Sequence, residues 1–346
     1  MFGILLEALR NARIAPEMST TERAALEAGD TWLDAELFSG RPALDRLFSE
    51  PYPQLDAREQ AFLDGPVRAV CEAMDPDVLD RTLDLPPAVW SLLREHRFFG
   101  LGVPEAYGGH GFSALAQSTI FGVLGSHSMP LSSVVLIPNS VGPAELLVEV
   151  GTEEQKATYL PRLVCGDEIP CFALTEPNAG SDAASMTSIG EVFRDADGEL
   201  RIRLTWEKRY ITLAPIATLL GLAFQLHDPD DLLGHGQHPG ITCALVPTDL
   251  PGVEIGRRHD PLGIPFPNGP TRGRDVVIPA SAIIGGPDYA GKGWRMLMEA
   301  LSGGRAVSLP AQATAGAKYV ARVAGAYARV RRQFGLPIGR FDGVSE

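Results

Sequence analysis

Several common functional signatures are missing from this chain of 346 residues. It contains no GxGxxG after a strand-like run, no Walker loop, no GxSxG elbow and no HExxH. These absences argue against a Rossmann dinucleotide site, a P-loop, a serine-hydrolase elbow and a zinc-protease helix. Positive charge is also scarce, because 30 Lys and Arg face 43 Asp and Glu for a net charge of −13. That balance argues against nucleic-acid binding, which needs a basic face.

Cysteines and long apolar runs are few as well. The four cysteines, Cys71, Cys165, Cys171 and Cys243, form no CxxC pair, so we expect buried, reduced thiols rather than a zinc site or a disulfide framework. The longest apolar run, 213–224, contains Pro215 and is well short of the roughly 20 residues of a spanning helix. The N-terminal run meets Glu7 too early for a secretory signal. We expect a cytoplasmic protein with at most peripheral membrane contact.

The length predicts more than one domain, and four parts can be distinguished. Residues 1–55 form an extension with one helix at 21–28, and residues 56–168 carry helical signals throughout. Residues 169–287 carry short strands, and residues 288–346 return to the helical period. The predicted fold class is α+β: an N-terminal all-α domain, a middle β-barrel or sandwich of antiparallel strands, and the start of a C-terminal helical bundle.

Local patterns support each part of this prediction. Phe62, Val67, Val70 and Met74 recur at helical spacing. Gly151 predicts the end of one helix, and Thr152 with Gln155 predicts a capping box for the next. Further helices are predicted at 113–124 and 132–150, and strands at 200–205, 241–246, 253–255 and 275–278.

The helical pattern after residue 293 is long and amphipathic. Gly303 and Gly304 favour a break or kink in it. Its apolar face has no later segment to cover it, which predicts a helical partner from another subunit or from further chain.

The segment 171–182 is the strongest candidate for a binding site. An apolar run leads into a polar turn built from Pro177, Asn178 and Gly180, and such a turn can bring backbone N–H groups close to a ligand. We expect four side chains to project hydrogen-bonding groups there: Thr175, Glu176, Ser181 and Asp182. The alternative is an ordinary strand end with a tight turn.

A second candidate lies at 206–212. Alternation along a strand would place Tyr210 and Thr212 on one face, where an aromatic ring beside a hydroxyl suits a flat heteroaromatic ligand. The alternative is a cross-strand packing pair. Two further clusters favour plain loops: the glycine-rich turn at 108–111, and the His- and Asp-rich stretch at 227–238, where a solvated hairpin is favoured over a metal site.

Four motifs, in this order, resemble those of the acyl-CoA dehydrogenase family from residue 56 to residue 346. They are Gly-Thr-Glu-Glu-Gln-Lys at 151–156 with Tyr-Leu-Pro at 159–161, Ala-Leu-Thr-Glu-Pro-Asn-Ala-Gly-Ser-Asp at 173–182, residues 208–212, and Arg-Arg-Gln-Phe-Gly-Leu-Pro-Ile-Gly at 331–339. The resemblance implies FAD bound without a Rossmann motif. The extension is similar to that of enlarged bacterial members acting on medium- and long-chain acyl-CoA.

The resemblance also implies residue roles. Thr175 would hydrogen-bond the flavin, Tyr210 and Thr212 would flank its ring, and Ser181 would lie near the flavin and the pantetheine arm of the substrate. Positions at the chain's end would reach the FAD of an adjacent subunit, which implies a homo-oligomer. These end positions are Arg331, Gln333 and Phe334; further cofactor contacts would be Phe172, Leu174, Gly180 and Ile211, and Arg305 would contact substrate.

The reaction implied is dehydrogenation of an acyl-CoA thioester to the trans-2-enoyl-CoA in fatty acid β-oxidation, with electrons leaving to an electron-transferring flavoprotein. The family's catalytic Glu would lie beyond Glu346, and the position that carries it in some relatives is Gly304; Glu299 is also not assigned. The resemblance therefore implies that this chain alone lacks turnover. The alternatives are an acyl-CoA oxidase type of flavoenzyme and a non-catalytic module that binds FAD or acyl-CoA.

Overall fold

The computed structural model describes residues 33–140 and 142–345, without the side chains of residues 34 and 300–305. The chain divides into two compact units, Met1–Gln54 and Leu55–Glu346. The helix expected at 21–28 lies outside the described residues. In the first unit, the Glu36 carboxylate accepts a hydrogen bond from the Ala43 backbone N–H at 2.8 Å, and it pairs with Arg46 at 3.6 Å. These contacts hold α3 (Asp34–Phe38) against α4 (Leu44–Ser49).

The second unit begins with helices, as the sequence predicts. Phe62, Val67, Val70 and Met74 are all buried. Their elements are α5 (Ala57–Phe62), a π-helical turn (Leu63–Val67), α6 (Arg68–Ala73), α7 (Pro76–Thr82), α8 (Pro87–Glu95), α9 (Ala114–His127), α10 (Met129–Ser140), α11 (Pro143–Val150) and α12 (Glu153–Cys165).

The single helix expected at 132–150 is wrong, because the structure has α10 and α11 in its place. Gly142 adopts extended backbone as the N-cap of α11, and Pro143 occupies the first helical position. Proline is preorganised for that position and cannot donate into a preceding helix. The sequence of Met129–Val150 is long and apolar enough to cross a membrane, but 71% of its apolar window is buried within the fold.

The capping box at the start of α12 is confirmed. Thr152 accepts from the Gln155 N–H at 3.2 Å, and the Gln155 side chain accepts from the Thr152 N–H. Gln155 also donates through Nε2 to the carbonyl oxygens of Ser281 and Ile283 at 2.8 and 2.7 Å. One cap residue therefore also ties the helical part to the segment that follows the sheet.

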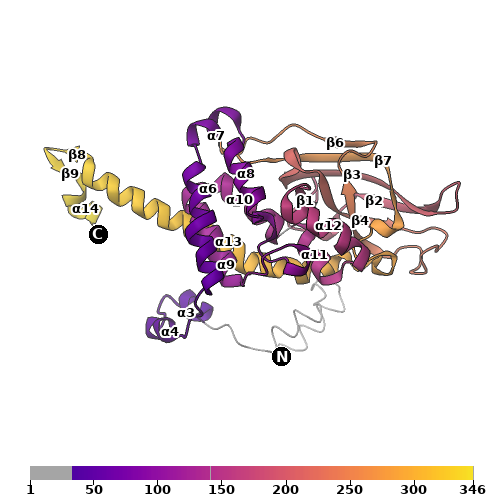
Figure 1. The fold of residues 1–346 in the computed structure, drawn as a ribbon, viewed down its shortest axis with the longest axis horizontal. Helices are drawn as coiled ribbons and strands as arrows, with labels where there is room; N and C mark the ends of the chain where they lie inside the picture. Colours follow the sequence, from indigo (N-terminus) through magenta and orange to yellow (C-terminus); the bar gives the residue numbers. More distant parts are fainter. Residues whose placement is uncertain (1–32, 141, 346) are drawn as a thin grey trace, which may run out of the picture. The chain divides into compact units, whose positions relative to one another are not determined.

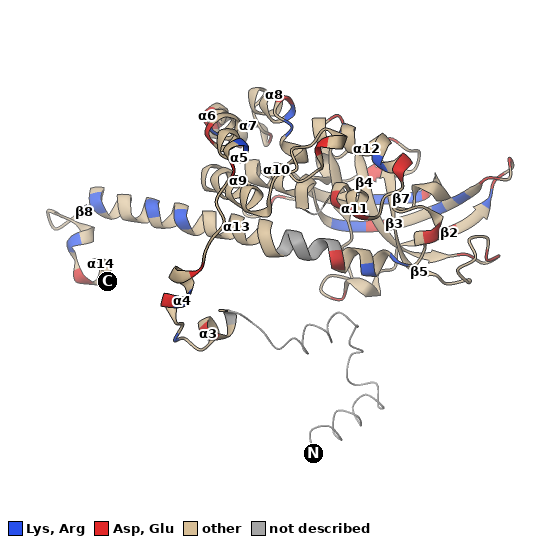
Figure 2. Ribbon diagram, turned by 60° about the horizontal axis from the view of Figure 1, so that its bottom comes forward, with Lys and Arg blue, Asp and Glu red and all other residues tan. Residues whose placement is uncertain are grey.

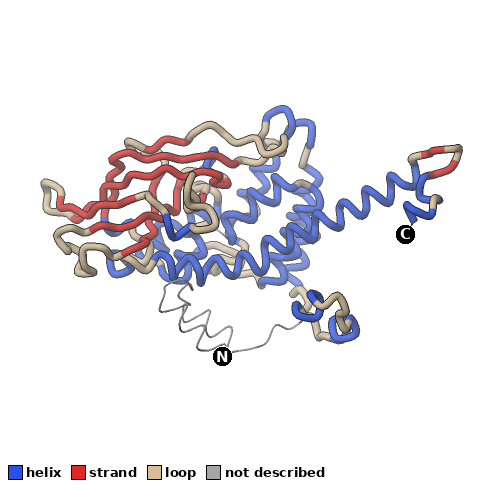
Figure 3. The backbone as a smooth tube through the Cα atoms, turned by 180° about the vertical axis from the view of Figure 1, so that it is seen from behind, coloured by secondary structure: helices blue, strands red, loops and turns tan. Residues whose placement is uncertain are grey.

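A curled, mixed sheet forms the middle part, with the helices of the second unit beside it (Figures 1 and 3). Its strands are β1 (Pro170–Ala173), β2 (Ile189–Arg194), β3 (Leu200–Thr212), β4 (Leu219–His227), β5 (Gly240–Pro247), β6 (Val253–Ile255) and β7 (Asn268–Pro279). The strand order is β1-β4-β2-β3-β7-β6, and β5 pairs with the free side of β4. The predicted fold class is confirmed.

Two pairings in this sheet are parallel, which the sequence did not predict. β1 pairs with the first half of β4, and β2 pairs with its second half. β4 is buried at seven of nine positions, so it reads as a continuous apolar run rather than as an alternating strand. Its neighbours cannot be identified from such a run.

α13 (Gly293–Val330) is a single helix of 38 residues, so the break favoured at residues 303–304 is wrong. Each glycine costs about 1 kcal/mol of helix propensity, but the middle of α13 packs along α9 and α10, where Ser308 meets Ser140 and Gln312 donates to Ser133. The far half exposes Tyr319, Val320 and Val330, so its apolar face is uncovered, as the sequence predicts. A hairpin of β8 (Arg332–Gln333) and β9 (Leu336–Pro337) follows, then α14 (Asp342–Ser345). Lys and Arg residues recur along this end of the chain (Figure 2).

Candidate cofactor site

The turn after β1 places the first set of predicted residues. Thr175 is partly buried, and its carbonyl oxygen accepts from the Arg209 N–H of β3 at 3.0 Å. A bridge between Glu176 and Ala179 closes the turn, and Gly180 and Ser181 are exposed beyond it. Within the described part of the chain, the Thr175 hydroxyl has no hydrogen-bond partner. The hydroxyl is therefore available to a ligand, at a place fixed by a backbone bond to β3.

Glu176 does not project toward a ligand, which corrects the expectation from the sequence. It is 4% exposed, and its carboxylate accepts from the N–H and hydroxyl groups of Thr187 and Ser188. The Lys208 ammonium pairs with it at 2.9 Å and also donates to the Leu174 carbonyl at 3.0 Å. The ion pair therefore fastens the turn to β3 from inside the fold.

These contacts determine the charge of the pair. Burial opposes ionisation of Glu176, but hydrogen bonds from Ser188 and Thr187 and the nearby Lys208 more than offset it and lower the pKa of Glu176 to about 2. Burial lowers the pKa of Lys208, whereas its partner Glu176 acts in the opposite direction. Glu176 is a fixed carboxylate and is not suited to exchange protons near neutral pH.

A bulge in β3 turns Tyr210 and Thr212 outward. Trp206 and Lys208 are buried, and strict alternation would bury residues 210 and 212 as well. The register with β7 shifts between Lys208 and Ile211, and Tyr210 adopts φ +58°. As a result Ile211 is buried, Thr212 is partly exposed and Tyr210 is 58% exposed. The two residues share a face, but the bulge decides which face it is.

Two residues beside this face were not singled out from the sequence. The ring of His259 lies 5.0 Å from the ring of Tyr210. Its Nδ1 lies 2.8 Å from Oδ1 of Asn268, and Nδ2 of Asn268 donates to Oγ1 of Thr212 at 3.2 Å. No local pattern marks them, since His259 is in a loop and the contact between Asn268 and Thr212 spans 56 residues.

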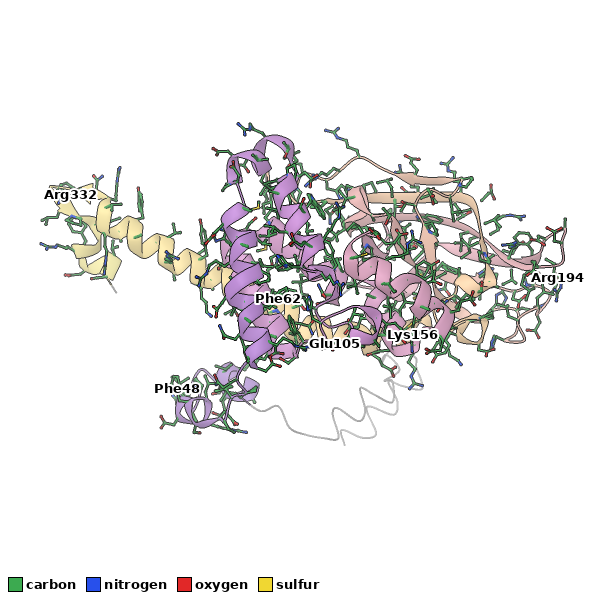
Figure 4. All side chains as sticks on the ribbon, viewed as in Figure 1. Phe48, Phe62, Glu105, Lys156, Arg194 and Arg332 are labelled. Atoms are coloured by element: carbon green, nitrogen blue, oxygen red, sulfur yellow. The ribbon has the colours of Figure 1, made fainter. Side chains whose placement is uncertain are left out.

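Other residues predicted to contact the cofactor are buried or lie elsewhere in the fold. The Phe172 ring is buried against the backbone of Gly221, where an added Cβ would come within 2.6 Å of the ring. Phe334 is 95% exposed on the β8–β9 hairpin beyond the far end of α13, where Arg332 is labelled in Figure 4. Among the described residues, no hydrogen bond or ring contact joins Arg331, Gln333 or Phe334 to Thr175, Tyr210 or Thr212. The Arg305 side chain is not described.

The remaining clusters behave as loops or packing groups. In the hairpin after β4, Asp228 is fully buried and accepts from the N–H groups of Leu232 and Leu233. Within the described ranges no group of His, Cys, Asp and Glu could hold a metal. Gly109 packs against the Val103 carbonyl, so the glycine-rich turn is tighter than a surface turn. Cys165 is partly exposed, whereas the other three cysteines are buried.

A small cavity of about 220 Å³ between α9, α10 and α11 is lined by Glu145 and Glu149. Burial and the neighbouring Glu149 raise the pKa of Glu145 to about 7. Because this value exceeds the ordinary 4.5, the contribution of Glu145 to stability is greatest below pH 4.5 and is lost as the pH rises through 7. For this partly exposed group we expect a loss on the order of 1 kcal/mol. Urea unfolding at pH 5 and pH 8 should show the loss, and Glu145→Gln should remove it. An equal change in unfolding free energy between the two pH values with and without Glu145→Gln would contradict the prediction.

Family models, similar sequences and solved structures all relate this chain to known proteins. Models of the acyl-CoA dehydrogenase N-terminal, middle and C-terminal domains match residues 56–167, 171–276 and 291–346. The protein HemX of Proteus mirabilis is 60% identical over 104 residues, which cover 30% of this chain and 61% of that protein. The probable acyl-CoA dehydrogenase FadE10 of Mycobacterium tuberculosis (strain ATCC 25618 / H37Rv) is 32% identical over 90% of this chain and 46% of its own length. The chain thus spans about half to three fifths of these relatives.

Solved structures share the fold. Butyryl-CoA dehydrogenase from Megasphaera elsdenii superposes with a TM-score of 0.72 at 27% identity, over 85% of this chain and 74% of that one. A structure titled PigA with FAD and proline superposes with a TM-score of 0.70 at 26% identity, over 84% of this chain and 73% of that one.

Proposed function

The chain belongs to the acyl-CoA dehydrogenase family, and from this membership we propose that it forms the FAD- and thioester-binding part of an enzyme that dehydrogenates acyl-CoA at the α,β position. One observation carries the proposal: the turn bearing Thr175 is bonded to β3 at the bulge that exposes Tyr210 and Thr212. Two motifs that are distant in sequence therefore form one surface.

This surface fits the cofactor of the family, FAD. The Tyr210 ring is 58% exposed, and the Arg209 guanidinium lies 4.3 Å from its centroid, so a flat ring system would stack on Tyr210 in place of Arg209. The unpartnered hydroxyl of Thr175 suits an acceptor on that ring. When bound, FAD supplies the hydride-accepting chemistry. Thr175, Tyr210 and Thr212 would hold and orient the ring, and the exposed Ser181 would lie beside it toward the substrate. No Rossmann loop is needed for this arrangement.

The proposal assigns no base among the described residues. Glu176 is buried and held as a carboxylate by four hydroxyl and N–H donors and by Lys208. Glu299 is engaged by Arg295 at 2.8 Å on α13. A carboxylate from elsewhere would remove the α-proton, and hydrogen bonds to the thioester carbonyl would stabilise the developing enolate.

Two partners belong to the proposal. Exposure of Phe334 and of the far half of α13 supports a second copy of the chain as one partner, with Arg331, Gln333 and Phe334 reaching its FAD. An electron-transferring flavoprotein would be the acceptor of the electrons. Chain-length preference for medium or long acyl groups and a place in β-oxidation remain part of the proposal, supported by the resemblance of the extension.

We expect Tyr210→Ala to weaken FAD binding about fivefold, because loss of ring stacking is worth about 1 kcal/mol. Flavin fluorescence titration of the chain would measure it, and Tyr210→Trp should retain binding. Tyr52→Ala is the matched control, since Tyr52 is a similarly exposed tyrosine in the first unit, outside both proposed faces. Equal losses for Tyr210→Ala and Tyr52→Ala would contradict this assignment.

The reaction can be tested separately from cofactor binding. We expect the FAD-loaded chain of 346 residues to bind acyl-CoA without steady turnover, because it holds no assigned base. Anaerobic mixing with acyl-CoA, followed by flavin absorbance, measures this. Steady dehydrogenation would contradict the missing base. Rapid reoxidation of reduced flavin by dioxygen would favour an oxidase, and failure of any acyl-CoA to perturb the flavin spectrum would favour a non-catalytic module.

A further inference from the structure

A chain of hydrogen bonds runs behind the exposed face of Tyr210 and Thr212. Asn268 Nδ2 donates to Thr212 Oγ1 at 3.2 Å, and Asn268 Oδ1 faces His259 Nδ1 at 2.8 Å. Asn268 is 7% exposed. Its amide therefore bonds inside the fold on both sides, to the hydroxyl on β3 and to the ring in the loop before β7.

The backbone holds the same three residues. Asn268 is the register partner of Thr212 between β7 and β3. The His259 N–H donates to the Asn268 carbonyl at 2.7 Å, and the His259 ring packs against Tyr210. The positions are thus fixed before any ligand binds.

The bonds have a direction. With its Oδ1 toward His259, Asn268 requires His259 to carry its proton on Nδ1, since an acceptor must face a donor. The same orientation turns the amide N–H₂ toward Thr212 and occupies one lone pair of the hydroxyl. A hydroxyl that accepts in this way keeps its own proton free to donate. The proton of Thr212 is then available on the outer face.

We propose that Asn268 and His259 are positioning residues that make the Thr212 hydroxyl a fixed hydrogen-bond donor to the flavin ring. The inference rests on the proposed FAD site and adds that Thr212 is the donor in its hydrogen bond to the ring. A fixed donor would interact differently with oxidised and reduced flavin, because reduction adds electron density to the ring and a hydrogen at N5. Asn268 and His259 would thereby shift the reduction midpoint without touching the cofactor.

The first test needs no cofactor. Long-range ¹H–¹⁵N NMR of the chain without FAD should show His259 as the neutral tautomer with the proton on Nδ1. Asn268→Leu removes the acceptor and should abolish that preference. A proton on Nε2 in the unsubstituted chain would mean that the Asn268 amide has the opposite orientation, and this would overturn the inference.

The second test measures the reduction midpoint of bound FAD. Thr212→Val should change the ratio of reduced to oxidised FAD affinity about tenfold, equivalent to a midpoint shift of about 30 mV for a two-electron couple. Asn268→Asp presents only acceptors, so Thr212 and His259 would both donate to it and the Thr212 proton would turn away from the ring. The midpoint should shift by a similar amount or more.

A double-mutant cycle separates this effect from added charge. Asn268→Asp should shift the midpoint less in the Thr212→Val background than in the unsubstituted chain, because the donor is already absent. Gln237→Glu makes the same amide-to-carboxylate change in the hairpin after β4 and should leave the midpoint unchanged. If Asn268→Asp shifts the midpoint equally in both backgrounds, the added negative charge alone explains the shift, and the inference is overturned.

FAD binding by the chain and the role of Asn268 and His259 can be disproved separately. If the unsubstituted chain does not bind FAD, the proposed function fails whatever tautomer His259 adopts. If FAD binds but Thr212→Val leaves the midpoint unchanged, only the inference fails.

Discussion

Lys208→Met is expected to destabilise the protein by about 3–5 kcal/mol, because it leaves the Glu176 carboxylate buried without its countercharge. Methionine retains the length of the apolar stem, so the change removes mainly the ammonium. The Leu174 carbonyl loses its bond to the ammonium in the same step. The free energy of unfolding, extrapolated from urea titrations at neutral pH, measures the effect.

A matched control is present in the same chain. Lys156 pairs with Glu153 at 3.1 Å on α12, where the Glu153 side chain is 84% exposed. Lys156→Met should therefore cost less than about 1 kcal/mol. Glu176→Gln combined with Lys208→Met should recover part of the loss at position 208, since no unpaired charge remains. Similar costs for Lys208→Met and Lys156→Met would show that burial of the pair is not what matters.

The pH dependence of the Glu176 contribution has a definite sign. Its pKa of about 2 in the fold lies below its ordinary 4.5, so the contribution is present above pH 4.5 and is lost as the pH falls toward 2. Glu145 contributes in the opposite sense, because its pKa is raised.

The helical part of the second unit could be predicted from the sequence because its signals are local. The buried positions on α5 and α6 and the cap at Thr152 each depend on spacings of three or four residues. The position of the turn after β1 could also be predicted, because its apolar and polar segments are adjacent in the sequence. What could not be predicted is which way Glu176 points. Its partner Lys208 is 32 positions away, and only the folded sheet brings them together.

The orientation of Tyr210 was beyond prediction for a different reason. Period-two alternation gives the relative faces of Tyr210 and Thr212, but a single inserted residue exchanges those faces. The register shift after Lys208 depends on pairing with β7, a strand some sixty residues later. Asn268 and His259 depend on the same pairing, so the residues behind the candidate site become visible only with the register.

Gly273→Ala is expected to destabilise the sheet by about 3 kcal/mol, toward the upper end of the cost of overpacking. Gly273 on β7 is the register partner of Trp206 on β3, and an added Cβ would lie 2.0 Å from the nearest ring carbon. The Trp206 ring is 3% exposed, and its Nε1 donates to Thr271 Oγ1 at 3.3 Å. It cannot move aside without breaking that bond or separating the strands.

Urea unfolding would measure this cost, and Gly122→Ala provides the control. Gly122 lies within α9 with open space where its Cβ would stand, so its replacement should stabilise by about 0.5–1 kcal/mol. Because β3 and β7 also carry Tyr210, Thr212 and Asn268, Gly273→Ala should weaken FAD binding together with stability, whereas Gly122→Ala should leave binding unchanged. A tolerated alanine at position 273 would mean that Trp206 can repack, and the register of these two strands would then not be what holds the candidate cofactor site in place.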